Sequence, residues 1–72
     1  MTYQLWETRT GNLIDDYRSK SDALDAVRGL LDDLGEDFVQ GCSLALEGKS
    51  GDVSMVAEGK ALLELALTTA TA

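Results

Sequence analysis

The chain has 72 residues, no histidine, a single cysteine and a formal net charge of −7. A chain this short makes one domain, and without histidine a lone thiol has no usual partner for catalysis or for zinc, so we expect no enzyme, metal or cofactor. The acidic charge disfavours direct binding to nucleic acid, no apolar run approaches the about 20 residues of a membrane span, and a lone cysteine fits the cytoplasm.

Residues 3–8 and 12–17 are predicted to form an antiparallel hairpin. Both stretches are rich in strand-forming residues, and Gly11 suits the short connection between them. In the register that we expect, Trp6 lies opposite Ile14 on the outer face of the hairpin. Because side chains alternate along a strand, the inner face then takes Tyr3, Leu5, Leu13 and Tyr17.

A helix after Ser19 is the most clearly marked element. Ser19 and Asp22 fit a capping box, with Ser21 as an alternative cap, and Gly35 marks the helix end. Apolar residues at spacings of three and four predict one buried stripe: Ala23, Leu24, Val27, Leu30, Leu31 and Leu34. We expect this helix to pack on one face of a sheet.

Residues 38–47 and 52–57 are predicted to form a second hairpin, joined by the turn 48–51. A four-residue turn places three pairs on the face toward the helix: Leu46–Val53, Leu44–Met55 and Cys42–Ala57. Cys42 is then a buried apolar residue and not a reactive thiol, since no basic residue lies beside it in the sequence.

Residues 58–67 are predicted to form a second helix, and 68–72 a frayed tail, so that 1–67 make up the single domain. The predicted class is α+β with the order ββαββα and a mainly antiparallel four-stranded sheet. We favour a sheet in which the first and third strands are central neighbours. The alternative follows chain order and needs a parallel central pair with a right-handed crossover.

The second helix is apolar around most of its circumference, which is typical of a helix that is sandwiched or that contacts another chain. The helix either covers the outer sheet face within the chain, or it forms an interface with another chain together with that face. A small domain gains stability by oligomerisation, so we expect a homodimer and a non-enzymatic acidic interaction module. Two alternatives stay open, an antitoxin-like inhibitor of a basic protein partner and a small-molecule-binding domain. The candidate interface residues are Trp6, Ile14, Val56, Leu62, Leu63 and Leu67.

Several short motifs carry a resemblance to known proteins: Leu5-Trp6-Glu7-Thr8, Gly11-Asn12-Leu13-Ile14, Ser21-Asp22-Ala23-Leu24 and Val27-Arg28. Together they resemble small uncharacterised bacterial proteins with a strand–Gly-Asn–strand start followed by a helix, which implies a bacterial protein and no particular activity. The hairpin followed by a helix is also similar to HicB-type antitoxins, although this chain lacks their third strand before the helix.

Overall fold

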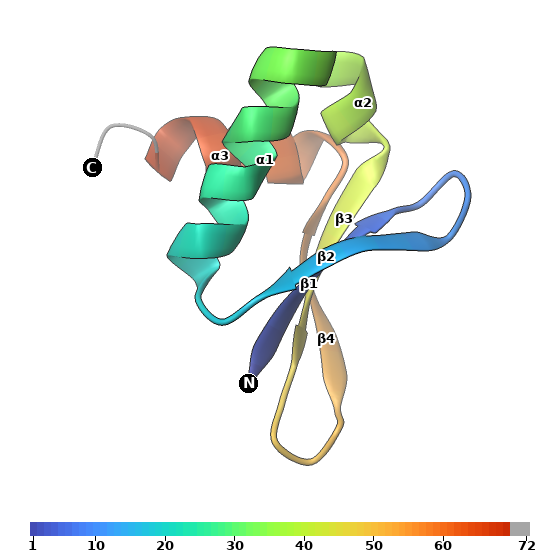
Figure 1. Cartoon of the computed structure of the whole chain (residues 1–72), viewed down its shortest axis with the longest axis vertical. Coiled ribbons are helices and arrows are strands. Elements are labelled where there is room, and N and C mark those ends of the chain that lie inside the picture. The colour runs from blue at the N-terminus through green and yellow to red at the C-terminus, as the bar shows by residue number, and fades with distance from the viewer. Residues whose placement is uncertain (70–72) are drawn as a thin grey trace.

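The computed structural model describes residues 1–69, which form one four-stranded sheet and three helices (Figure 1). In chain order the elements are β1 (Thr2–Glu7), β2 (Asn12–Tyr17), α1 (Lys20–Leu34), α2 (Glu36–Gln40), β3 (Cys42–Glu47), β4 (Val53–Glu58) and α3 (Lys60–Thr69). The sheet order is β2-β1-β3-β4 with every neighbouring pair antiparallel, which confirms the predicted α+β class and the favoured strand order. The last helix extends two residues beyond the predicted end, and 70–72, the rest of the predicted tail, lie outside the described residues.

All three helices pack on the same face of the sheet, and the core lies between the helices and that face. Leu5 and Leu44 pair across β1 and β3, and both are fully buried there. Figure 1 shows the helices gathered on one side, with the far end of the β3–β4 hairpin extending beyond them. The helices contribute Ala23, Leu24 and Val27 from α1, Val39 from α2, and Leu62, Leu63 and Ala66 from α3.

The ends of α1 lie where the sequence predicts them. The hydroxyl oxygen of Ser19 accepts a hydrogen bond from the backbone N–H of Asp22 at 3.0 Å, and the N–H of Gly35 donates to the carbonyl of Leu31. The apolar stripe is buried most deeply in its first half, whereas Leu31 is half-buried and Leu34 is 56% exposed. The N-terminal half of α1 is therefore the part of this helix that enters the core.

A short helix, α2, replaces the predicted start of the third strand. Gly35 has a φ of 88°, a conformation that side-chain-bearing residues rarely adopt, and it turns the chain between α1 and α2. Glu36 and Asp37 lie in the first turn of α2, where carboxylates favour the exposed N–H groups. Val39 is fully buried, so this turn closes one end of the core, and the strand begins only at Cys42.

The register of the first hairpin is partly as predicted and changes at a bulge. Tyr3 pairs with Tyr17 as expected, and both pack against the core. Nearer the turn, Trp6 pairs with Leu13, because Ile14 is an extra residue in β2. The predicted Trp6–Ile14 pair is therefore wrong, and Leu13 shares the face of Trp6 instead of the inner face.

The predicted register of the second hairpin is wrong throughout. The connection has five residues, 48–52, so Val53 pairs with Glu47 and Met55 pairs with Ala45. A shift of one residue moves a strand's side chains to the opposite face, which takes Val53 and Met55 away from the helices. Val56 is an extra residue in β4 that packs against the core, where the sequence placed it on the outer face.

We expect Leu62→Ala to lower the free energy of unfolding by about 2–5 kcal/mol, because it opens a cavity at a fully buried side chain. The same change at the exposed residue Leu34 should cost less than about 0.5 kcal/mol. Urea denaturation of both variants and of the unmodified chain measures the difference. Equal losses at the two positions would contradict the burial of α3 in this core.

Replacing Ser19 with alanine should lower the free energy of unfolding by about 1 kcal/mol, because the N–H of Asp22 loses its acceptor. Ser21→Ala is the matched control, since Ser21 lies exposed inside the first turn of α1. Both variants are measured by urea denaturation. A loss of stability at Ser21 with none at Ser19 would mean that Ser21, and not Ser19, caps the helix.

Candidate functional site

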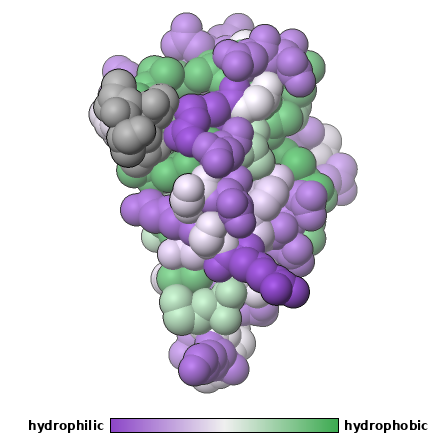
Figure 2. Space-filling model, turned by 60° about the vertical axis from the view of Figure 1, so that its left-hand side comes forward, coloured by the Kyte–Doolittle hydropathy of each residue, from purple (hydrophilic) through white to green (hydrophobic). Residues whose placement is uncertain are grey.

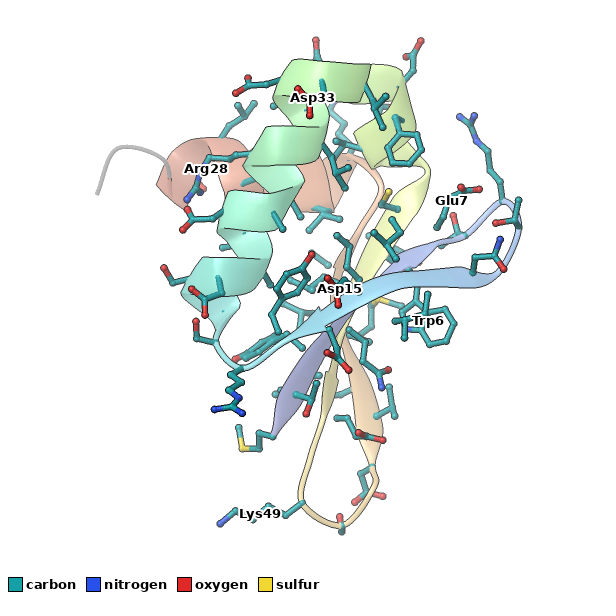
Figure 3. All side chains as sticks on the ribbon, in the orientation of Figure 1. Trp6, Glu7, Asp15, Arg28, Asp33 and Lys49 are labelled. Atoms are coloured by element: carbon teal, nitrogen blue, oxygen red, sulfur yellow. The ribbon has the colours of Figure 1, made fainter. Side chains whose placement is uncertain are left out.

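The sheet face opposite the helices is uncovered in this chain, and we call it the open face. Strand pairing arranges its residues in three rows across the sheet. The indole N–H of Trp6 donates to the side-chain oxygen of Gln4 at 3.3 Å, which joins two neighbours on this face. Figure 3 shows Trp6 projecting away from the helices. The rows are Leu13–Trp6–Ser43–Glu58, then Asp16–Gln4–Ala45–Met55, then Thr2–Glu47–Val53.

Apolar side chains on the open face are accessible to solvent. Val53 is 57% exposed, Met55 56% and Leu13 45%, while Ile14, at the bulge beside them, is 37% exposed. Ala45 is buried although it lies outside the core cluster, so its neighbours on the open face cover it. By contrast, the side of the molecule seen in Figure 2 is mostly hydrophilic, with hydrophobic atoms in separate patches. Exposed apolar side chains that gather on one face are typical of binding sites.

The charged residues in the three rows of the open face are all acidic. Asp16, Glu47 and Glu58 lie in the three rows, one in each. The chain has six lysines and arginines, and none of them lies in a strand. Lys49 lies in the β3–β4 turn and extends beyond the end of the sheet (Figure 3). The strand residues of the open face therefore combine apolar side chains with carboxylates and include no lysine or arginine.

The structure separates the predicted interface residues. Trp6 lies on the open face and Ile14 at its edge, whereas Val56 packs against the core. Leu62 and Leu63 are buried within the chain, because α3 packs on the same sheet face as α1, so neither is available to a partner. Leu67 is 50% exposed on α3, away from the open face.

Sequence reasoning missed three open-face residues: Leu13, Val53 and Met55. Their placement depends on the bulge at Ile14 and on the length of the second turn. A bulge needs no particular residue type, and a four- or five-residue turn fits the glycine-rich segment 48–52 equally well. No signal in the sequence distinguishes these registers.

Cys42 is buried, as the sequence predicts. Its side chain is 1% exposed, and its Sγ–H donates to the carbonyl oxygen of Phe38 at 3.3 Å. Burial raises the pKa of the thiol, the nearby carboxylate of Glu7 raises it further, and Arg9 acts in the opposite direction. The thiol is therefore held in its protonated, unreactive form.

The remaining acidic residues do not assemble into a metal centre within residues 1–69, where no group of three potential ligands converges. Asp15 and Asp16 pair with Leu5 and Gln4, so their side chains point to opposite faces. None of the helices in this part of the chain is long and apolar enough to cross a membrane.

Comparison of the chain with known protein families, curated proteins and solved structures gives no match. The resemblance to HicB-type antitoxins therefore stays a prediction from the sequence.

We expect Cys42 to react with a thiol reagent such as dithionitrobenzoate far more slowly in the folded protein than in urea. Reaction requires the thiolate, and both the burial and the raised pKa of Cys42 lower its accessible amount. The same chain unfolded at the same pH serves as the control. Labelling at the unfolded rate under native conditions would place the thiol at the surface.

Proposed function

We propose that this protein is a non-enzymatic interaction module that binds a basic polypeptide through the open face of its sheet. The single observation behind the proposal is the composition of that face. Exposed apolar side chains, among them Leu13 and Met55, lie beside carboxylates, and no lysine or arginine lies in any strand. Apolar contact gives such a surface its affinity, and the carboxylates select the charge of its partner.

A polypeptide suits this surface better than a small molecule does. Small-molecule sites are concave and surround most of the ligand. The open face is the outer surface of a sheet, and its exposed residues spread from one edge strand to the other. A small molecule lying there keeps most of its own surface in water, whereas an extended partner covers several exposed side chains at once.

A second copy of the chain is the competing occupant. A two-fold interface on the open face brings each residue near residues of the same face. Asp16, Glu47 and Glu58 of one copy then face a surface whose strand residues include the same three carboxylates and no lysine or arginine to pair with them, and like charges that come together across an interface cost several kcal/mol. This argument favours a basic partner, which is one of the alternatives left open by the sequence. The homodimer, the inhibitory role and the bacterial, cytoplasmic setting stay predictions.

The only tryptophan lies on the open face, so its fluorescence reports binding there. As probes we choose blocked peptides of about 14 residues made of leucine and lysine, and matching peptides of leucine and glutamate. We expect a leucine–lysine peptide to shift the emission of Trp6 and to bind at least about tenfold tighter than its glutamate counterpart, with an affinity that falls as salt rises.

Charge variants distinguish local from overall attraction. The triple variant Asp16→Asn, Glu47→Gln, Glu58→Gln should lose most of the preference for lysine. The control variant Asp32→Asn, Asp33→Asn, Glu36→Gln changes the net charge equally, away from the sheet, and should keep it. Equal losses in both variants contradict the proposed site. If sedimentation equilibrium shows a dimer and Met55→Glu splits it into monomers, a second copy of the chain occupies the open face. That result overturns the proposal.

A further inference from the structure

The apolar residues of the open face lie along one diagonal of the sheet. Leu13 and Trp6 are in the first row on β2 and β1, Ala45 and Met55 are in the second row on β3 and β4, and Val53 is in the third row on β4. From Leu13 to Val53 the line crosses three strand spacings and four residue positions, which is about 20 Å. We call these five residues the diagonal strip.

Carboxylates lie on both sides of the diagonal strip. Asp16, in the second row on β2, and Glu47, in the third row on β3, are on one side. Glu58, in the first row on β4, is on the other side. A partner that fills the strip therefore needs apolar side chains along its middle and positive charges on both flanks. That is the cross-section of an amphipathic helix with lysine or arginine on either side of its apolar face.

The edges of the sheet are poorly suited to an added strand. β2 carries the extra residue Ile14 and β4 carries the extra residue Val56, and each bulge interrupts the ladder of its edge strand. A strand lying across the apolar face is also unfavourable, because its own N–H and C=O groups find no partners there. A helix pairs these groups internally.

The middle of the diagonal strip has small side chains on β3 between two larger ones on the neighbouring strands. Ala45 and Ser43, on the central strand β3, are small and have their side chains covered, whereas Trp6 and Met55 stand on either side of them. A helix of about 13 residues spans 20 Å. Helix on sheet is also the packing that covers the other face of this same sheet.

From this geometry we propose that the open face binds a basic amphipathic helix of about 13 residues, lying along the diagonal strip from Leu13 to Val53. The inference rests on the proposed function and adds the conformation and the path of the bound segment to it. Aliphatic side chains of the helix contact Trp6 and Met55, and its flanking lysines or arginines pair with Asp16, Glu47 and Glu58.

The test compares two peptides of identical composition. In one, leucine and lysine follow helical spacing, and in the other they alternate, which suits a strand. Titration is followed by the emission of Trp6 and by circular dichroism of the peptide. We expect the helically spaced peptide to bind about tenfold tighter and to gain helical signal on binding. Equal or tighter binding of the alternating peptide overturns the helix while leaving the proposed function standing.

Variants of the diagonal strip test the path. The double variant Leu13→Ser, Met55→Ser removes one exposed apolar side chain from β2 and one from β4. It should lower the affinity for the helically spaced peptide by about tenfold or more. The control, Leu34→Ser with Leu67→Ser, removes two exposed leucines from the helices and should leave binding unchanged. Equal effects of the two doubles overturn the inference. If neither of the two lysine-containing peptides binds, the proposed function itself is overturned.

Discussion

The structure depends on the packing of all three helices against one face of the sheet, centred on the Leu5–Leu44 pair. A domain of this size has few apolar side chains, and a single well-filled core uses them better than two partial ones. Leu62, Leu63 and Ala66 of α3 reach the same cluster as Val27 of α1. Because α3 is used there, nothing within residues 1–69 covers the other sheet face. The open face is thus a consequence of how the core is filled.

Local capping explains why α1 was predictable. Ser19 accepts a backbone N–H hydrogen bond with its side chain at one end, and Gly35 adopts a positive φ at the other, and both are local properties of these residue types. The central pairing of β1 with β3 was predictable for a different reason. It keeps every neighbour antiparallel and leaves Asp15, Asp16 and Asp52 at or beyond the edges, where charge discourages strand addition. Both inferences rest on single strong preferences.

The prediction failed where two arrangements have similar local energies. The segment 36–40 contains Phe38 and Val39, which suit strands, yet the turn at Gly35 and the acidic start at Glu36 favour a helix. Helix α3 is apolar on more than one side, so its pattern does not tell which sheet face it covers. The structure resolves the choice because Leu62 and Ala66 fill space that α1 and α2 leave in the core.

The two bulges connect the edges of the sheet with the composition of its open face. The bulge at Ile14 sets Leu13 beside Trp6 on the open face. Without the bulge, Leu13 would lie on the inner face, as Asp15 does. The bulge at Val56 lets two consecutive residues face the helices, so that Glu58 returns to the open face. The same irregularities interrupt both edge ladders. Interrupted edges are poor templates for added strands, which is consistent with the proposal that a partner binds the open face.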